Sequence, residues 1–313
     1  MAFTPLKETY PGKVYTVEIG KGEKAVTFAG ENVLPFHTFE GASPNRPVIA
    51  YEIQDMPPDE WPDTVRKPYS GISSDPVSWA RFCQDSLGAK VIALRLVSTH
   101  PDRLDRSPDE AAKTVSDVLA AIDIPLIILG SNHAEKDASV LVAAAGAAKD
   151  SNCIIGKAQE ANYKTIAAAA MANNHKLIAM SELDINLSKQ LNILITQMGF
   201  EKDRLIIDPM CSALGYGLEY TYSVMERIRL AALAQNDATM QQPILGDIGM
   251  YVWKVKEAQA VETSVSGWGA LEERGISWEA VTAASMLIAG AELLIMWHPE
   301  AVQKVESLID ELY

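Results

Sequence analysis

Side chains able to bind a ligand follow many of the short apolar runs in this sequence. Most are neutral hydrogen-bonding groups or isolated acids, whose chemistry is recognition through hydrogen bonds. They are Glu52, Asp55, Arg95, Thr99, Asn132, Gln159, Asn162, Ser181, Glu182, Asp208, Cys211, Asp247 and His298. The sequence contains no His-x-His, no His-Glu-x-x-His and no close pair of cysteines. Neighbouring residues therefore build no metal site, although distant ones could still converge.

The run LIIDPM ends in an acid followed by proline. An acid at the end of a buried strand is costly unless it hydrogen-bonds to a loop or a ligand, so Asp208 is a candidate ligand contact. The thiol of Cys211 would either face a ligand or pack as a small apolar group under the loop. Ser212 to Gly217 form a glycine-bearing loop before a helix, and its backbone N–H groups could hold an anionic or amide-rich ligand.

One lysine and three histidines could supply reactive nitrogen atoms. Lys157, in the middle of IIGKAQ, is the candidate amine of a Schiff-base aldolase. The alternative is a structural lysine, paired with a carboxylate such as Glu182 or lying on the outer face of its strand. His100, His133 and His298 follow strand ends, where an imidazole is either a general base or a hydrogen-bonded loop residue. The sequence leaves both alternatives open.

From Val48 onward, apolar runs alternate with segments of helical periodicity, a pattern typical of parallel strands joined by crossover helices. The runs cover residues 48–55, 91–97, 125–130, 153–159, 176–181, 205–210, 242–247 and 293–298. They are continuously apolar, as expected of strands covered on both faces. Eight such units predict an α/β fold, a (β/α)₈ TIM barrel. Its ligands bind at the C-terminal ends of the strands, where the polar residues named above lie.

The segments outside the repeating units are also informative. VYTVEIG and KAVTFAG flank a Lys-Gly-Glu turn and predict a β-hairpin that closes the bottom of the barrel or presents an edge. We therefore divide the chain into an N-terminal β-hairpin extension, residues 1–46, and a TIM barrel, residues 47–313. Residues 56–76, rich in proline and glycine, predict an excursion over the top of the barrel. Residues 249–278 predict a loop or a broken helix.

Two helices have clear signals. Ser107, followed by Pro108, Asp109 and Glu110, is a typical helix start. A second helix begins near Gly217, and its apolar residues recur every three or four positions, which predicts one buried stripe. The stripe contains Leu218, Tyr222, Met225 and Ile228, and we expect Glu226, Arg227 and Arg229 to face outward.

Composition excludes several classes of protein. A chain of 313 residues with 48% apolar and 22% charged residues can bury a substantial core. Its formal charge of −14, with dispersed Lys and Arg, argues against nucleic-acid binding. No secretory signal or membrane-spanning stretch is present, so we expect a cytoplasmic protein without membrane contact. Cys83, Cys153 and Cys211 suit reduced thiols and are too few for a four-cysteine cluster.

Three long segments carry a resemblance to a known family. They are DPMCSALGYGLEYTYSVMERIRLAAL (208–233), QPILGDIGMYVWKVKEA (242–258) and SWEAVTAASMLIAGAELLIMWHPEAV (277–302). Together with VIAYEIQDMPPDEWPDTVRKPY near the first strand, they resemble the small subunit of the corrinoid/iron–sulfur protein. This subunit is also called the delta subunit of the CO dehydrogenase/acetyl-CoA synthase system. The resemblance extends along the whole chain, and ALGYGLEYTYSVMERIR is its most specific part.

The resemblance implies a heterodimeric methyl carrier of the reductive acetyl-CoA (Wood–Ljungdahl) pathway of carbon fixation in anaerobes. In that family a corrinoid receives a methyl group on cobalt from a methyltetrahydrofolate methyltransferase and delivers it to acetyl-CoA synthase. The large subunit contributes the [4Fe–4S] cluster, and the small subunit is a barrel against which the corrinoid (cobamide) rests. The sequence lacks the Asp-x-His-x-x-Gly motif by which one class of corrinoid proteins ligates cobalt. We therefore expect this chain to be a carrier subunit rather than an enzyme by itself.

No family motif assigns individual corrinoid contacts, so the prediction of contacts rests on barrel geometry. Amides of the corrin need hydrogen-bond partners, and the strand ends offer them. The predicted neighbours of the corrinoid are Asn132, Gln159, Asn162, Asp208, Cys211, Ser212 and Asp247. None of them is predicted to ligate a metal or to be catalytic.

A stand-alone enzyme is the alternative from another class. Pterin-dependent methyltransferases resemble this chain in having a barrel with an Asp-Pro at the end of a strand that binds the pterin, and Asp208 matches that position. Their other pterin contacts are Asp and Asn residues at further strand ends. Here the third strand ends in Gly130-Ser131-Asn132 and the fourth in Gln159-Glu160, an incomplete match. Folate binding by the isolated chain would favour this alternative.

Overall fold

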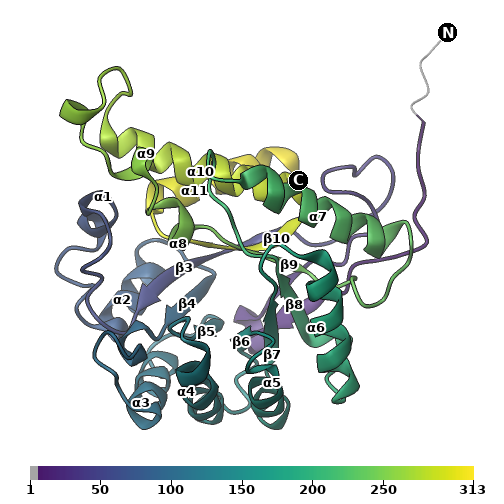
Figure 1. Ribbon diagram of the computed structural model, residues 1–313, viewed down its shortest axis with the longest axis horizontal. Coiled ribbons are helices and arrows are strands. Elements are labelled where there is room, and N and C mark those ends of the chain that lie inside the picture. Colours follow the sequence, from purple (N-terminus) through teal and green to yellow (C-terminus); the bar gives the residue numbers. More distant parts are fainter. Residues whose placement is uncertain (1–5) are drawn as a thin grey trace.

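A computed structural model describes residues 6–313, and its eight parallel strands close into a barrel surrounded by helices (Figure 1). The strands are β3 (Val48–Gln54), β4 (Val91–Arg95), β5 (Leu126–Leu129), β6 (Ile154–Ala158), β7 (Lys176–Met180), β8 (Leu205–Asp208), β9 (Ile244–Asp247) and β10 (Ala291–Met296). Each pairs with the next along the chain, and β10 closes the barrel on β3. The predicted (β/α)₈ barrel is confirmed. Seven predicted runs contain their strand, and the eighth strand begins two residues before its run.

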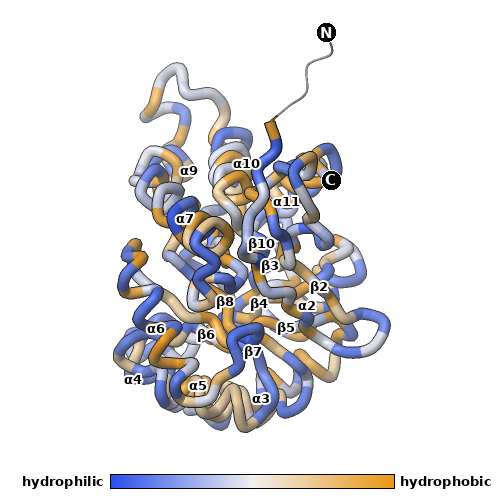
Figure 2. Tube along the Cα trace, turned by 90° about the vertical axis from the view of Figure 1, so that its right-hand side faces the viewer, coloured by the Kyte–Doolittle hydropathy of each residue, from blue (hydrophilic) through white to orange (hydrophobic). Residues whose placement is uncertain are grey.

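Helices of very different length connect these strands. They are α1 (Asp63–Arg66), α2 (Pro76–Asp85), α3 (Pro108–Leu119), α4 (Ala134–Ala147), α5 (Tyr163–Ala172), α6 (Ile185–Gln197), α7 (Leu218–Leu233), α8 (Gly249–Val252), α9 (Lys256–Gln259), α10 (Leu271–Ala289) and α11 (Pro299–Leu312). The helix start predicted at Ser107 is confirmed, because Ser107 and Glu110 form a reciprocal capping box. Apolar strands lie inside and hydrophilic stretches on the surrounding helices (Figure 2).

The N-terminal hairpin closes the bottom of the barrel, one of the two roles predicted for it. Its strands β1 (Val17–Ile19) and β2 (Val26–Phe28) pair antiparallel. Val17, Ile19 and Phe28 are buried in the same apolar cluster as the inward-facing residues of the barrel strands. The N–H of Gly20 donates to the carbonyl oxygen of Asn152, which precedes β6 (3.0 Å). The hairpin therefore fills the end of the barrel where the strands begin.

Two irregular segments lie at the opposite end, the mouth. Residues 56–76 form the predicted excursion, which carries α1, and Trp61 within it stacks on Trp297 beyond β10 (ring centroids 4.1 Å apart). Residues 249–270 form the predicted broken helix: α8, α9 and a short 3₁₀ turn follow one another, and the last part projects beyond the barrel (Figure 1). The regular helix α10 begins at Leu271, seven residues earlier than the predicted end of this segment. Arg274 holds the segment through hydrogen bonds to its backbone carbonyl oxygens.

The helix predicted after Gly217 is confirmed as α7, but one of its residues was misplaced. Leu218, Met225 and Ile228 are buried as expected, whereas Arg229 is 1% exposed instead of facing outward. Arg229 lies four residues after Met225, so helical periodicity itself places it on the buried stripe. Its guanidinium pairs with Glu292 at the bottom of the barrel.

Within residues 6–313, no helix combines the length and the apolar character needed to cross a bilayer.

Candidate functional site

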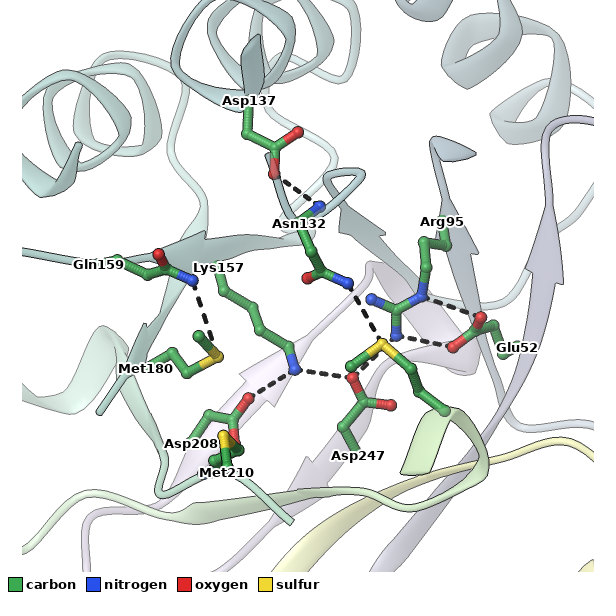
Figure 3. A network of polar contacts seen from close by, with 11 residues as sticks. Glu52, Arg95, Asn132, Asp137, Lys157, Gln159, Met180, Asp208, Met210 and Asp247 are labelled. Atoms are coloured by element: carbon green, nitrogen blue, oxygen red, sulfur yellow. Dashed lines mark hydrogen bonds and ion pairs between the residues drawn. The ribbon is translucent and has the colours of Figure 1, made fainter. Parts of the chain in front are cut away.

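Five charged side chains form a chain of contacts across the mouth of the barrel (Figure 3). Arg95 donates from Nε and Nη2 to the carboxylate of Glu52 (2.9 and 2.7 Å), and Nη2 also donates to Oδ2 of Asp247 (2.8 Å). Lys157 Nζ lies 2.7 Å from Asp247 Oδ2 and 2.7 Å from Asp208 Oδ2. All five are buried. These residues come from β3, β4, β6, β8 and β9, so closure of the barrel alone brings them together.

The electrostatics of this network keep its basic groups charged. Burial by itself would lower the pKa of Lys157, but the carboxylates of Asp208 and Asp247 outweigh it and hold that pKa above its usual value. Burial would likewise lower the pKa of Arg95, but the carboxylates of Asp247 and Glu52 outweigh burial and raise that pKa above its usual value. Burial would raise the pKa of Asp247, whereas Arg95 and Lys157 bring it below its usual value.

This geometry favours the structural lysine over the amine of a Schiff-base aldolase, since pairing with two buried carboxylates disfavours the neutral amine that must attack a carbonyl group. Its partners also differ from the predicted one. Glu182 is exposed, and Asp208 and Asp247 take its place.

The hydrogen bonding of the network is incomplete. Arg95 Nη1 and Asp247 Oδ1 are buried and have no hydrogen-bond partner among the described residues. A buried polar atom without a partner costs about 1–3 kcal/mol, so such atoms are uncommon in a part of a protein that serves stability alone. This incompleteness marks the mouth as a candidate binding site.

Thioethers and amides border the network. Asn132 Nδ2 donates to Met250 Sδ (3.2 Å), and Gln159 Nε2 lies 3.9 Å from Met180 Sδ. The side chains of Met180 and Met210 lie near Lys157 (Figure 3). Thioethers are polarizable and adapt their shape to a flat apolar surface, and amides both donate and accept hydrogen bonds. The mouth can thus hold a ligand that is apolar on its face and polar at its edge.

A residue that the sequence did not single out positions Asn132. Asp137, in the first turn of α4, accepts hydrogen bonds from the N–H and hydroxyl of Ser131 (2.8 Å each) and from the N–H of Asn132 (2.9 Å). A side chain at Gly130 would collide with this carboxylate, because its Cβ would lie 2.4 Å from Asp137. The clamp keeps Asn132 in the left-handed region (φ 70°), exposed at the mouth. An acid a few residues after a Gly-Ser-Asn loop was the available sequence signal.

The other predicted neighbours of the corrinoid are less exposed. Asn162 is buried and holds its own loop, because Oδ1 accepts from Gln159 N (2.8 Å) and Nδ2 donates to Ala134 O (3.1 Å). Cys211 is buried, and burial raises the pKa of its thiol. Ser212 is partly exposed, and its N–H donates to Thr221 Oγ1 (3.0 Å). The structure thus brings Asn132, Gln159, Asp208 and Asp247 to the mouth network, while contact of any of the seven with a corrinoid stays a prediction.

Three backbone N–H groups of the loop before α7 are engaged within the protein. Leu214 N donates to Thr282 Oγ1 (3.3 Å) and Tyr216 N donates to Ala213 O (2.9 Å). With Ser212 N also engaged, these groups are not available to hold an anion.

Each of the three histidines at strand ends accepts a hydrogen bond within its own loop. His133 and His298 cap α4 and α11, each accepting a backbone N–H through Nδ1. His100 Nδ1 accepts the N–H of Asp102 (3.1 Å). Burial lowers the pKa of His298, which keeps it neutral.

A cavity of about 570 Å³ opens at the mouth beside the network. Trp61, Trp253 and Trp297 form apolar parts of its wall, and Gln54 and Asn132 contribute amides. Behind the wall, the buried carboxylate of Glu279 accepts from Trp253 Nε1 (2.8 Å), Trp297 N (2.6 Å) and His298 N (3.0 Å). Burial raises the pKa of Glu279 to about 7.

Comparison with known proteins shows which family this chain belongs to. The family model described as CO dehydrogenase/acetyl-CoA synthase delta subunit matches residues 16–307. The chain belongs to this family. Among curated delta subunits of the acetyl-CoA decarbonylase/synthase complex, that of Methanothermobacter thermautotrophicus is 35% identical over 98% of this chain and 77% of its own length. Subunit delta 1 of Methanosarcina thermophila is 37% identical over 94% of this chain and 68% of its own length. The resemblance stated from the sequence is confirmed.

Solved structures of similar shape include dihydropteroate synthases. The enzyme from Coxiella burnetii in complex with pteroic acid has a TM-score of 0.57 and 13% identity, covering 85% of this chain and 93% of its own. The enzyme from Xanthomonas albilineans in complex with 7,8-dihydropteroate has a TM-score of 0.56 and 14% identity, covering 85% and 94%. At this identity the likeness concerns the barrel fold alone. As a delta subunit, the chain is a component of the acetyl-CoA synthase complex.

Proposed function

We propose that this delta subunit is the small subunit of a heterodimeric corrinoid/iron–sulfur methyl carrier. Its barrel mouth supports a corrinoid at the interface with the large subunit. The carrier takes a methyl group from a methyltetrahydrofolate methyltransferase to acetyl-CoA synthase, and this chain is not itself an enzyme. The observation that carries the proposal is the mouth, where thioethers and amides surround a buried network whose charges are already engaged.

The side chains of the mouth fit a corrinoid. A corrin is a broad, mostly apolar disc with carboxamides along its edge. Met180, Met210 and Met250 provide soft apolar contacts for the face, and the amides of Asn132 and Gln159 provide partners for the edge. When bound, the corrinoid supplies the cobalt that accepts and releases the methyl group.

The chain's own nitrogen and sulfur groups leave such a ring without a strong protein ligand. Lys157 is protonated and held by two carboxylates. Cys211 stays a buried thiol, and the Nδ1 atoms of His100, His133 and His298 accept backbone hydrogen bonds. The proposal assigns the [4Fe–4S] cluster to the large subunit, because the three cysteines of this chain are buried at separate places.

The test is anaerobic co-production of this chain with the large subunit in corrinoid-supplied cells, followed by size exclusion with detection at corrin wavelengths. We expect a 1:1 complex that carries the corrin band, whereas this chain produced alone elutes colourless. A complex that carries no corrin band although the cells were supplied with corrinoid, or a chain that does not bind the large subunit, would contradict the proposal.

The same preparation tests the alternative of a pterin-dependent methyltransferase. Isothermal titration of the isolated chain with methyltetrahydrofolate should give no heat of binding under the carrier proposal. Saturable binding by a colourless monomer would favour the stand-alone enzyme instead.

A further inference from the structure

The cavity beside the charge network has a lining that selects the charge of its occupant. Four carboxylates and three cationic side chains contribute to it, so the lining holds no surplus of positive charge. The one buried cation, Arg95, is already paired with Glu52 and Asp247. Because desolvating an anion next to carboxylates is strongly unfavourable, the cavity suits a neutral group.

Two amide side chains at this cavity have hydrogen-bonding capacity left. Gln54, the last residue of β3, lines the cavity, and none of the side-chain hydrogen bonds found within residues 6–313 involves it. Asn132 is engaged only through a weak contact of its Nδ2 with the sulfur of Met250, which leaves its carbonyl oxygen available. An amide pairs best with another amide, because each offers one carbonyl acceptor and one NH₂ donor.

The position of Asn132 is fixed in advance. Asp137 accepts three hydrogen bonds from the Ser131–Asn132 backbone and hydroxyl, and this holds Asn132 in a left-handed conformation. Asparagine adopts this conformation readily, and the hydrogen bonds to Asp137 hold it in one orientation; preorganised polar groups are typical of ligand contacts. The indoles of Trp61 and Trp297 beside it provide an apolar wall for the methylene stem of a side arm.

From these features we infer that the cavity between Gln54 and Asn132 binds a primary carboxamide on a short methylene stem. This inference rests on the proposed function, in which the group is a carboxamide arm of the corrin periphery. With about 570 Å³ the cavity is of ligand-site size, yet it occupies one side of the mouth only, so it receives an arm rather than the ring.

The test compares two corrinoids that differ in the charge of their arms. The complex of this chain with the large subunit, freed of corrinoid, is dialysed against dicyanocobinamide, whose arms are amides, or dicyanocobyrinic acid, whose arms are carboxylates. Corrin absorbance gives Kd. We expect the amide form to bind at least about tenfold more tightly, since the acid brings negative charge to a lining that already has more carboxylates than cationic side chains.

Variants locate the effect. Gln54→Glu and Asn132→Asp should each weaken cobinamide binding by about 3- to 10-fold, the value of one lost neutral hydrogen bond. Gln54→Met should do the same without adding charge, and it decides the matter if Gln54→Glu fails to fold. Gln190→Glu, on the exposed side of α6, is the matched control and should bind like the wild type.

Two results would overturn the inference, and they are distinguishable. If the Gln54 and Asn132 variants bind cobinamide like the control, or if the wild-type complex binds both corrinoids equally, the arm is not recognised here, while the proposed function stands. If the wild-type complex binds neither corrinoid, the proposed function fails together with the inference.

Discussion

The Arg229–Glu292 pair at the bottom of the barrel and the charge network at its mouth both bury charged side chains, but among the described residues only the pair has a hydrogen-bond partner for every buried polar side-chain atom. At the bottom, every buried nitrogen and oxygen atom of Arg229 and Glu292 has a partner within residues 6–313. Arg229 donates to the carbonyl oxygen of Gly290 and pairs with Glu292. At the mouth, Arg95 and Asp247 are equally buried, yet each keeps one atom without a hydrogen-bond partner in the described chain.

This difference separates two uses of buried charge. A network that is fully connected holds elements together, and the Arg229 cluster joins α7 to the start of β10. A network with unpartnered atoms is less stable than it could be, and proteins retain such places where a ligand completes the contacts. One substitution in the Arg229 cluster and one in the mouth network test this difference.

The largest effect is expected at the bottom. Arg229→Met leaves the carboxylate of Glu292 buried beside Glu31 without its cation, which should lower the free energy of unfolding by about 3–5 kcal/mol. Urea denaturation measures the free energy of unfolding of the variant and of the wild type. Arg227→Met, an exposed position on the same helix, should change stability by less than about 0.5 kcal/mol. Equal effects of the two variants would mean that the bottom cluster does not stabilise the barrel.

At the mouth, we expect a smaller loss for Lys157→Met, about 3 kcal/mol, because Arg95 still neutralises Asp247 at 2.8 Å. Adding Asp208→Asn should recover most of this stability, since it removes the carboxylate that Lys157→Met leaves unpaired, while corrin retention by the complex should remain impaired. Lys149→Met, at an exposed position, is the control. A double variant as unstable as the single one would contradict this account of the network.

The wall of the cavity should make stability depend on pH. The pKa of Glu279 is about 7 in the folded chain against an ordinary value of 4.5, so ionisation is less favourable in the folded state. Its contribution to the free energy of unfolding is therefore complete below pH 4.5 and falls, by on the order of 3 kcal/mol, as pH rises to about 7.

Thermal unfolding across pH 4–8 measures this dependence against two variants. Glu279→Gln should remove that part of the slope, whereas Glu273→Gln, an exposed position on the same helix, should keep it. A wild-type slope that survives in Glu279→Gln would show that another group titrates.

The smallest effect concerns the rim of the mouth, where α3 begins. Ser107→Ala removes the capping-box acceptor of the Glu110 N–H and should lower the free energy of unfolding by about 1 kcal/mol. Ser116→Ala, exposed within the same helix, should be neutral or slightly stabilising, because alanine favours helix interiors. Corrin binding should be unchanged in both, and a loss of binding in Ser107→Ala would extend the site to this rim.

Several of these features were visible in the sequence because they are local. The apolar runs predicted their strands, and Ser107 with Glu110 predicted a helix start, since each signal lies within a few residues. The prediction that Arg229 faces outward was wrong although its helical position was visible in the sequence, because the prediction gave more weight to its charge than to its spacing of four residues from Met225. The partner of Lys157 was not predictable in this way, since Asp247 lies 90 residues further along the chain.

By itself, then, the sequence determined the class of fold, the hairpin, the helix starts and membership of the delta-subunit family, because apolar periodicity and long motifs are properties of the chain. Only the tertiary structure decided which charges meet at the mouth, that Asp137 clamps Asn132, and that the bottom cluster is complete while the mouth is not. The physical reason is closure of the barrel. It brings the ends of distant strands within hydrogen-bonding distance, and burial then makes every remaining polar contact energetically significant.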